Sequence, residues 1–534
     1  MTTARWLESA CADADGRGLP GLKPLLAGLA AATDTLRAAD WNDTATADAG
    51  PVADRLPHRC DAPRPARGDD AGPPPSGHAG PSSRPAHFRT IAELAPMLAS
   101  GDITSEGLTA ACLAEIAGKS DPLRAFITVL PDDVLDRARS LDRERAAGIS
   151  RGPLHGIPIS IKDLIDVQGL PTTAASQVRQ GHVASGDAPV IARLRAAGAV
   201  IVGKTNLHEF AFGTTSEDSA FGAVRNPHDP SRSPGGSSGG SAVSIVTGMS
   251  VASIGTDTGG SIRIPSAACG VVGLKPTWGE IPCGGVVPLS ESLDHVGPMT
   301  RSVADAWLLY LVLRGDAAAA ARPLPARAGV GGLRIGVPRP YFLDLLDEEV
   351  RQRFAESLAW LRQAGATTVD VAIPHAPEIA AIYLLTSMPE ASAYHATGVT
   401  AHPELYTANV RLRIEMGRYL LGEDYVRAQR GRLVLRAEVD TALAGCDVLA
   451  LPALPIPAPP IGAVSVDIGG AGHPVRNLML RMTQLFNLTG HPALSLPMGL
   501  TASGLPCGLQ LVGRRHDTEG LLGAALACET RLAS

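Results

Sequence analysis

Helical and strand-like patterns alternate along most of the chain, from Phe88 to the end. Apolar residues recur every three or four positions in several stretches, which predicts helices over 90–101, 104–118, 134–148, 188–198 and 347–365. Runs rich in β-branched residues predict strands over 157–167, 199–205, 333–338 and 367–374. A longer helical pattern covers about 405–444 and precedes an apolar run at 447–457. Such alternation is typical of an α/β fold with a large mixed sheet covered by helices on both faces.

The N-terminal part has a different pattern. Five leucines fall on one stripe of a helix predicted over 20–41: Leu22, Leu25, Leu26, Leu29 and Leu36. Residues 61–86 are instead rich in proline, glycine, aspartate and serine, so burial of apolar groups there cannot offset the entropy lost on ordering the chain. We therefore expect a small helical appendage over 1–46, a disordered linker over 47–86 and one large domain over 87–530.

Composition and charge narrow the class of protein. The 534-residue chain is 45% hydrophobic and 19% charged, as in globular proteins with a large core. Its formal net charge of −6 argues against direct binding of nucleic acid. The N-terminus lacks the pattern of a secretory signal, and no apolar run reaches the roughly 18 residues that a membrane span requires. These features favour a cytoplasmic enzyme that acts on a small molecule away from any membrane.

Cysteine and lysine usage adds two points. The eight cysteines are scattered and show neither a C-x-x-C pair nor metal-ligand spacing, so we expect free thiols, no metal and no cofactor. Only five of the 47 basic residues are lysines: Lys23, Lys119, Lys162, Lys204 and Lys275. Because a buried lysine can lose its proton near neutral pH whereas arginine does not, each lysine is a candidate for a role that arginine cannot fill.

Two corners rich in glycine and serine lie close together, GGSSGGS at 235–241 and TGGS at 258–261. A phosphate-binding loop would need a lysine where Ser241 stands. A nucleophile elbow of the form G-x-S-x-G is matched formally by the first corner, with His491 or His516 as its histidine, but no strand pattern precedes it.

A third interpretation of the glycine-serine corners is that both form one catalytic site with Lys162, which lies in the apolar segment 157–167. Burial disfavours the charged amine and can lower its pKa by up to about 3–5 units. A neutral lysine can act as a base toward a serine without a histidine. The glycine-rich backbone before Ser261 offers N–H groups in a turn, as an oxyanion hole requires. The small-residue stretch 241–256 between the corners predicts a buried helix and strand.

Together these segments resemble the amidase signature family of serine hydrolases. The resemblance rests on GIPISIKDLIDV at 156–167, GGSSGGSA at 235–242 and GTDTGGSIRIPSAACGVVGLKPTWG at 255–279, and it continues in NLTGHPALSLPMGL at 487–500. It covers about residues 87–530 and implies the α/β fold with a mixed sheet that the alternation predicts.

The resemblance also implies a Ser–cis-Ser–Lys triad. Ser261 matches the nucleophile, Ser237 matches the serine that follows a cis peptide bond and relays the proton, and Lys162 matches the base. The residues that match the oxyanion hole through their backbone N–H groups are Thr258, Gly259, Gly260 and Ser261. The implied reaction is hydrolysis of a carboxamide C–N bond through an acyl-enzyme, with release of a carboxylate and ammonia or an amine.

Other polar residues near these motifs are expected to be structural. Asp257 and Arg263 flank the second corner, and we expect them to hold it by hydrogen bonds or an ion pair rather than to act on substrate. Lys204, Lys275 and His208 are likewise expected to support the fold.

The substrate pocket is less defined by the sequence. In this family the segment between the two halves of the fold, here about 305–450, builds part of the acyl pocket. It offers Tyr383, Met388, Tyr394, Tyr406 and Tyr425, any of which could equally belong to the core. Because aromatic residues make up 4% of the chain, we expect a modest pocket.

Two alternative functions stay open. The segment PTTAAS at 171–176 resembles the versions in allophanate hydrolases and in the A subunit of tRNA-dependent amidotransferases. The chain could therefore be a glutamine-hydrolysing A subunit within a complex, or a ureido amide hydrolase of the allophanate or carboxybiuret type. Residues 1–46 distantly resemble small helical subunits that accompany some enzymes of nitrogen-compound breakdown, and they could hold a partner subunit or a second copy. An inactive scaffold is disfavoured because all three triad positions are occupied.

Overall fold

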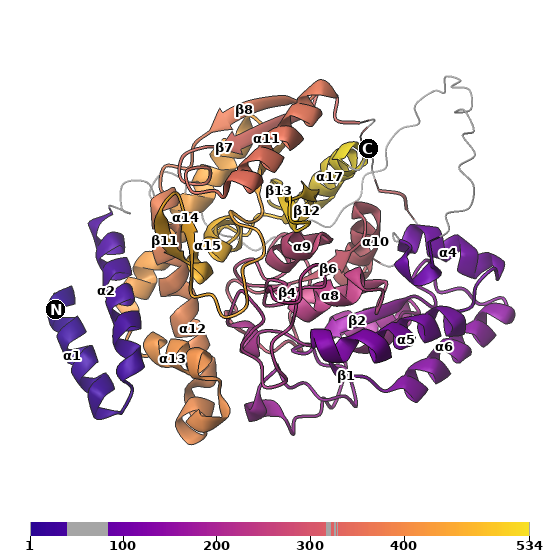
Figure 1. The fold of residues 1–534 in the computed structure, drawn as a ribbon, viewed down its shortest axis with the longest axis horizontal. Coiled ribbons are helices and arrows are strands. Elements are labelled where there is room, and N and C mark those ends of the chain that lie inside the picture. Colours follow the sequence, from indigo (N-terminus) through magenta and orange to yellow (C-terminus); the bar gives the residue numbers. More distant parts are fainter. Residues whose placement is uncertain (1, 40–83, 317–321, 325–326, 328, 533–534) are drawn as a thin grey trace, which may run out of the picture.

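A mixed sheet of eleven strands forms the centre of the molecule (Figure 1), which the computed structural model describes for residues 2–39, 84–316, 322–324, 327 and 329–532. The strand order is β1–β3–β2–β4–β6–β5–β12–β13–β9–β7–β8. The strands are β1 (Phe126–Thr128), β2 (Pro158–Lys162), β3 (Val200–Thr205), β4 (Ala252–Asp257), β5 (Val272–Lys275), β6 (His295–Thr300), β7 (Arg334–Pro338), β8 (Thr367–Val371), β9 (Val448–Pro452), β12 (Ala493–Leu500) and β13 (Pro506–Val512). β2 pairs in parallel with β3 and β4, and β7 with β8 and β9, whereas the other pairs are antiparallel.

Helices cover both faces of this sheet, as the sequence predicts. The helices of the main body are α4 (Ile91–Ser100), α5 (Ser105–Leu123), α6 (Pro131–Ala146), α7 (Pro189–Ala196), α8 (Gly239–Val246), α9 (Arg263–Cys269), α10 (Val303–Arg314), α11 (Glu348–Gln363), α12 (Ile379–Ala401), α13 (Ala408–Gly417), α14 (Gly422–Ala444), α15 (Val475–Arg481), α16 (Leu485–Leu488) and α17 (Thr518–Leu532). Side-chain caps begin several of them; Ser302, for example, accepts from the Asp305 N–H at the start of α10.

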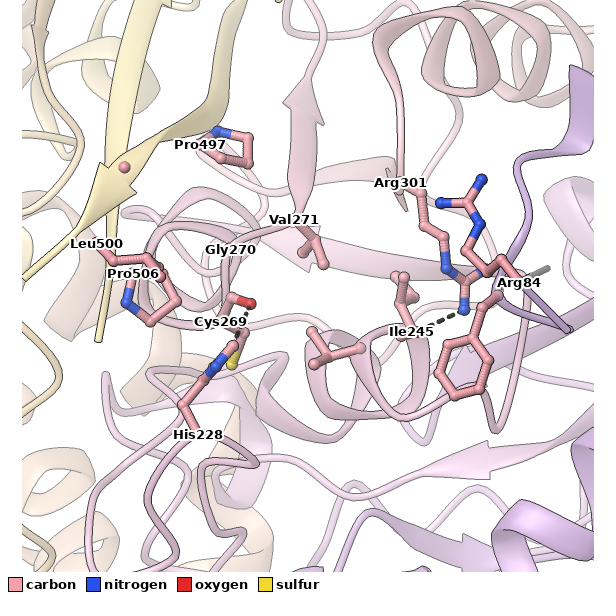
Figure 2. A pocket seen from close by; sticks show the side chains of 13 residues that line it. Arg84, His228, Ile245, Cys269, Gly270, Val271, Arg301, Pro497, Leu500 and Pro506 are labelled. Carbon is pink, nitrogen blue, oxygen red and sulfur yellow. Dashed lines mark hydrogen bonds between the residues drawn. The ribbon is translucent and has the colours of Figure 1, made fainter. Parts of the chain in front are cut away.

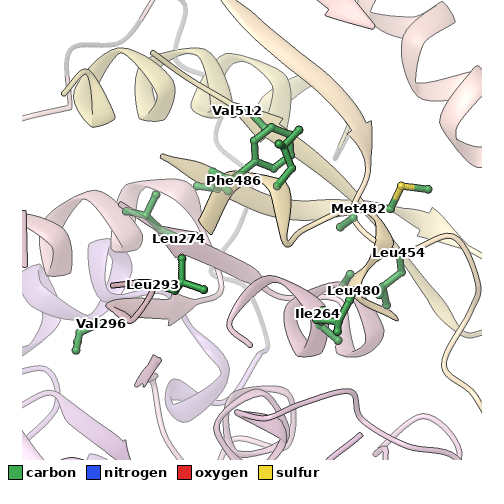
Figure 3. Close-up of a cluster of buried hydrophobic side chains, with 14 of the residues drawn as sticks. Ile264, Leu274, Leu293, Val296, Leu454, Leu480, Met482, Phe486 and Val512 are labelled. Atoms are coloured by element: carbon green, nitrogen blue, oxygen red, sulfur yellow. The ribbon is translucent and has the colours of Figure 1, made fainter. Parts of the chain in front are cut away.

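The two faces carry separate hydrophobic clusters. Val200 and Val202 of β3 belong to the smaller cluster, which α5, α6 and α8 complete. Ile159 and Ile161 of the neighbouring strand β2 belong to the larger one. Figure 3 shows part of the larger cluster, to which α9 contributes Ile264. Because the central strands are buried on both faces of the sheet, their sequences are continuous apolar runs rather than alternating ones.

Most predicted elements occur near their expected residues, but the long helical pattern over 405–444 does not form one helix. The chain forms α13 and α14 there, with residues 418–421 between them. Gly417 ends α13 so close to α12 that an added Cβ would lie 2.3 Å from the Met388 carbonyl oxygen. The chain turns away at this contact, and α14 begins a new helix with acidic residues in its first turn.

The N-terminal segment forms two helices, α1 (Thr3–Gly16) and α2 (Lys23–Ala38); α2 packs against α12, α13 and α14, and α1 packs on the outer side of α2 (Figure 1). Four leucines of the expected stripe are buried, Leu22, Leu26, Leu29 and Leu36, whereas Leu25 is partly buried. Polar contacts fix the docking: the Trp6 indole N–H donates to the Tyr419 carbonyl at 2.9 Å. The apolar face of this appendage is therefore covered by the chain's own helices. Residues 40–83, which hold most of the expected linker, lie outside the described residues.

Two further expectations can be compared with the structure. The seven cysteines in the described part of the chain are free thiols, as expected. None of the described helices is both long and apolar enough to cross a membrane.

Candidate active site

Lys162 is the last residue of β2, the middle strand of the parallel group β3–β2–β4. Its side chain is fully buried, and its Nζ lies 2.7 Å from Ser237 Oγ and 2.8 Å from Thr256 Oγ1 of the adjacent strand β4. Within the described residues, no carboxylate lies at ion-pair distance from this amine. Burial lowers the pKa of Lys162 to about 7, against a smaller opposing effect of Asp257 and Asp294. A large neutral fraction of the amine therefore exists near pH 7.

Ser237 is held in the first glycine-serine corner, just before α8. The Gly236–Ser237 peptide bond is cis. The Ser237 carbonyl accepts from the His208 N–H at 3.1 Å and from Ser216 Oγ at 3.2 Å. An added Cβ on Gly236 would lie 2.7 Å from the Ser216 nitrogen, so only glycine fits this approach. The Ser237 side chain is fully buried.

Ser261 lies in the second corner, between β4 and α9. It is 6% exposed whereas Ser237 is 0% exposed, so Ser261 is the serine that solvent reaches. The Ser238 N–H donates to the Ser261 carbonyl at 3.2 Å and joins the two corners. Ser261 Oγ forms no hydrogen bond with any described residue. The structure thus brings Lys162 into contact with Ser237 and places Ser261 on the neighbouring corner.

The backbone N–H groups of the second corner are not equivalent. The Gly260 N–H donates to Asp257 Oδ1 at 2.8 Å and is therefore not free to bind an oxyanion, unlike the expectation from the sequence. The Gly259 and Ser261 N–H groups have no partner among the described residues. The Thr258 hydroxyl donates to Asp294 Oδ1 at 2.6 Å, which ties the start of this corner to the residue before β6.

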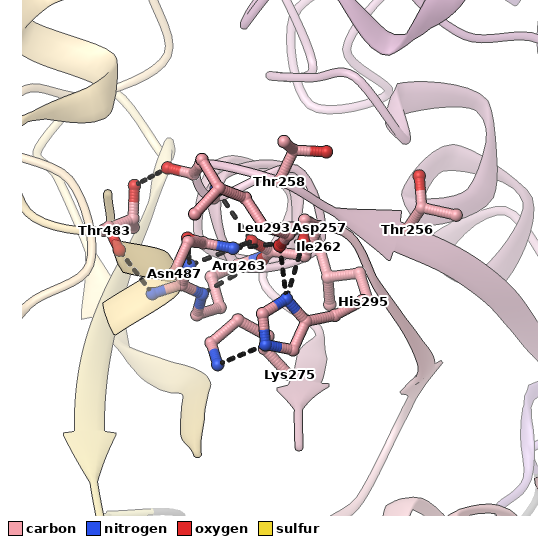
Figure 4. Close-up of polar contacts among 12 residues, drawn as sticks. Thr256, Asp257, Thr258, Ile262, Arg263, Lys275, Leu293, His295, Thr483 and Asn487 are labelled. Atoms are coloured by element: carbon pink, nitrogen blue, oxygen red, sulfur yellow. Dashed lines mark hydrogen bonds and ion pairs between the residues drawn. The ribbon is translucent and has the colours of Figure 1, made fainter. Parts of the chain in front are cut away.

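Asp257 and Arg263 flank the second corner and form a buried ion pair beneath it (Figure 4). Both are fully buried, and Arg263 donates to the two carboxylate oxygens at 2.9 and 3.0 Å. Burial alone would raise the pKa of Asp257, but the Arg263 guanidinium holds it well below its usual value. Arg263 also donates to Asn487 Oδ1 at 2.6 Å and to the Thr483 carbonyl at 2.9 Å. The pair acts as the structural clamp that the sequence suggests.

The histidines of the elbow alternative do not reach the serines. His491 Nδ1 lies 2.9 Å from Thr489 Oγ1, and its Nε2 lies 3.0 Å from Asp440 Oδ1. For His516, the contact is between its backbone N–H and Thr277 Oγ1, at 3.1 Å. Neither ring contacts Ser237 within the described residues, so the geometry does not support the elbow interpretation.

The family model described as Amidase matches residues 107–522. The chain belongs to the amidase signature family.

Three similar proteins show the range of this family. The A subunit of glutamyl-tRNA(Gln) amidotransferase from Anaeromyxobacter dehalogenans (strain 2CP-C) is 41% identical over 468 residues, which cover 80% of this chain and 93% of that protein. A crystal structure of an amidase has a TM-score of 0.79 at 37% identity and covers 83% of this chain and 100% of its own. A structure described as an unexpected vestigial complex that reveals the origins of an s-triazine catabolic enzyme has a TM-score of 0.78 at 33% identity, covering 83% of this chain and 98% of its own.

The other lysines of this amidase-signature chain have structural partners. Lys204 pairs with Asp163 at 3.0 Å, and both side chains are fully buried. Lys275 donates to the His491 carbonyl at 2.6 Å and lies 3.2 Å from His295 Nε2 (Figure 4). His295 Nδ1 lies 2.6 Å from the Leu293 carbonyl, which makes Nδ1 the protonated nitrogen and Nε2 the acceptor. Sequence reasoning missed His295, because its contacts form only when β5 and β6 pair.

Two adjoining cavities lie near Asp294, the residue that accepts from the Thr258 hydroxyl of the second corner. They measure about 510 and 360 Å³ and share Pro288, Glu291 and Tyr394 in their linings. The larger one reaches Asp294, whose pKa burial raises to about 6. Tyr425 lines the smaller one. Two of the five candidate pocket residues from the sequence thus line cavities.

The remaining three candidates lie elsewhere. The Tyr383 hydroxyl packs against Gly259, whereas Met388 and Tyr406 are buried in the core. A separate, largely apolar cavity of about 410 Å³ contains none of the candidate catalytic residues (Figure 2). Within the described residues, no three His, Cys, Asp or Glu side chains come together in a way that could hold a metal ion.

Proposed function

We propose that the chain hydrolyses a small carboxamide through an acyl-enzyme formed on Ser261. The observation that carries the proposal is the 2.7 Å contact between Ser237 Oγ and the fully buried amine of Lys162. Because the pKa of this amine is about 7, its neutral form can accept a proton at physiological pH. The chemistry needs no histidine.

The proposed steps follow the two corners. The Ser237 hydroxyl donates its proton to neutral Lys162 and takes the proton of Ser261, whose oxygen attacks the amide carbonyl. The N–H groups of Thr258, Gly259 and Ser261 stabilise the oxyanion, while the Gly260 N–H remains bonded to Asp257. The relay then returns the proton to the leaving nitrogen. A water molecule repeats the attack and releases the carboxylate.

A glutamine-hydrolysing A subunit is the second candidate, and the similar sequences favour it. Relatives named as A subunits of glutamyl-tRNA(Gln) amidotransferase are 38–41% identical to the chain. Such a protein would use the same steps on glutamine and supply ammonia to a partner. A ureido amide hydrolase is the third candidate, and the likeness to a structure described as revealing the origins of an s-triazine catabolic enzyme is consistent with it.

The purified chain tests these candidates together. Ammonia release is measured over aliphatic, aromatic and ureido amides and glutamine, with Ser261→Ala as the inactive control. A free amidase releases ammonia without any partner subunit, whereas a glutaminase that belongs to a complex is nearly inactive without its partner. A fluorophosphonate probe followed by peptide mapping is expected to label Ser261. Labelling of Ser237 instead, or full activity of Ser261→Ala, would overturn the proposal.

A further inference from the structure

Within the described part of the chain, hydrogen bonds hold three of the four peptide units of the second corner. In the first unit, the Asp257 carbonyl accepts from Asn487 Nδ2 at 3.0 Å (Figure 4). In the third, the Gly259 carbonyl accepts from Thr483 Oγ1 at 2.6 Å. In the fourth, the Gly260 carbonyl accepts from a backbone N–H of α9 at 2.7 Å. Each of these units is therefore oriented by a partner outside the corner.

The remaining unit joins Thr258 to Gly259, and neither its carbonyl oxygen nor its N–H has a partner among the residues that the structure describes. It carries the Gly259 N–H, one of the proposed oxyanion donors. Because Gly259 has no side chain, a contact of the Thr258 side chain is what can hold the first end of this unit. The Thr258 hydroxyl makes that contact by donating to Asp294 Oδ1 at 2.6 Å. Oxyanion donors are effective when they are oriented before the reaction, so this contact bears directly on catalysis.

Asp294 is itself fixed by the backbone. Its Oδ2 accepts from the Leu289 N–H at 3.0 Å and from the Ser290 N–H at 3.1 Å. The side chain also lines the larger of the two adjoining cavities. Because the loop before β6 holds the carboxylate, the Thr258 hydroxyl meets a preformed acceptor whether or not a substrate is bound.

The charge of Asp294 is less secure than that of Asp257, since no cation lies within ion-pair distance of Asp294 in the described ranges. Burial raises the pKa of Asp294 to about 6, and the Glu390 carboxylate of α12 adds to this rise. Protonation turns one acceptor oxygen into an O–H donor, which cannot accept from the hydroxyl and the backbone N–H groups as before. The other ionisable side chains around Asp294 are Lys162 of β2, Tyr383 of α12, Cys283, and the cavity residues Asp166, Arg179, His182 and Glu291.

We propose that Asp294 is a positioning residue of the reaction: through the Thr258 hydroxyl, it orients the peptide unit whose Gly259 N–H receives the oxyanion. This inference rests on the proposed function, because it gives that N–H a part in catalysis. Asp257 holds the Gly260 side of the corner as one half of an ion pair. Asp294 holds the Thr258 side through hydrogen bonds alone, so this is the side that protonation loosens.

Labelling of Ser261 by a fluorophosphonate probe tests the contact. We expect Thr258→Val to lower the rate constant at about pH 8 by about ten-fold or more, because the donor to Asp294 is lost and the oxyanion donor is displaced. Thr258→Ser keeps the hydroxyl and should stay within about three-fold of the wild type. Thr247→Val is the matched control, since the Thr247 hydroxyl donates to the Val243 carbonyl at the end of α8.

Asp294→Asn tests the carboxylate and the pH dependence that it adds. The logarithm of the wild-type rate constant should fall with a slope of about 1 below about pH 7, as Lys162 is protonated, and of about 2 below about pH 6, as Asp294 is protonated too. In Asp294→Asn the slope should remain about 1. Asp305→Asn is the matched control and should keep the wild-type slopes. Burial also raises the pKa of Asp305 to about 6, but its carboxylate accepts from the Ile91 and Ala92 N–H groups of α4.

A Thr258→Val variant that is labelled as fast as the wild type would overturn the inference, and so would a wild-type slope that stays at about 1 down to about pH 5. Hydrogen exchange of the peptide 257–262, measured by mass spectrometry, gives a readout without labelling. Thr258→Val and Asp294→Asn should exchange faster there than the wild type, and the two control variants should not. Equal exchange in all these proteins contradicts the positioning role. If Ser261 proves unreactive while the difference in exchange remains, the proposed reaction fails and the positioning of the corner by Asp294 stands.

Discussion

Lys162, Asp257 and Arg263 are all fully buried, and the effect of burial on Lys162 and on Asp257 depends on the groups that each side chain contacts. Asp257 accepts hydrogen bonds from two guanidinium nitrogens of Arg263, Nε and Nη2, and this cation holds the pKa of Asp257 below its usual range. Lys162 faces the hydroxyl groups of Ser237 and Thr256 instead. Because hydroxyls stabilise an ammonium less than a carboxylate does, burial dominates and the pKa of the amine falls.

Gly259 offers a test at the scale of one residue. A methyl group there would lie 2.4 Å from the Tyr383 hydroxyl, so the corner must shift. We expect Gly259→Ala to lower kcat by about 100-fold or more through displaced oxyanion donors, with a small change in stability. Steady-state kinetics and thermal unfolding measure the two effects.

The matched control for this variant is the Gly259→Ala/Tyr383→Phe double variant. Removal of the phenol oxygen leaves more room for the methyl group, so part of the activity should return. A Gly259→Ala enzyme with wild-type kcat would contradict the role of this backbone segment.

At the scale of single elements, local patterns predicted elements well where burial leaves either an apolar stripe on a helix or a continuous apolar run in a strand. The leucine stripe over 20–41 predicted α2, and the apolar run around Lys162 predicted β2. The break between α13 and α14 was missed because its cause is tertiary: Gly417 approaches the backbone of α12. Residues distant in sequence set this boundary, so a local pattern cannot reveal it.

The docking of the N-terminal helices makes a second prediction. Leu26 of α2 is fully buried, whereas Leu25 beside it is only partly buried. We expect Leu26→Ala to reduce the free energy of unfolding by about 2–5 kcal/mol and Leu25→Ala by clearly less. Urea denaturation of the full chain measures both. Equal, negligible losses would show that α2 does not pack on α12–α14 in solution.

At the scale of the whole molecule, the candidate site is assembled from segments far apart in the chain. The motifs of the sequence predicted Lys162, Ser237 and Ser261, because each lies in a long, ordered pattern. They did not predict that the Gly260 N–H donates to Asp257. Nor did they predict that Arg413 and Arg476 both contact Phe212, one through its carbonyl and the other through its ring. These contacts depend on how α13 and α15 pack against the corner, and no spacing in the sequence encodes that packing.

The pH dependence of Ser261 labelling by a fluorophosphonate probe tests the central claim most directly. Because the neutral amine of Lys162 is the base, the rate constant should rise with pH, reach half of its maximum near the amine pKa of about 7, and then level off. Lys162→Arg, which keeps its charge, should be labelled at least about 100-fold more slowly at every pH. A wild-type rate that does not change between about pH 5.5 and 9, or a Lys162→Arg variant labelled as fast as the wild type, would contradict the account.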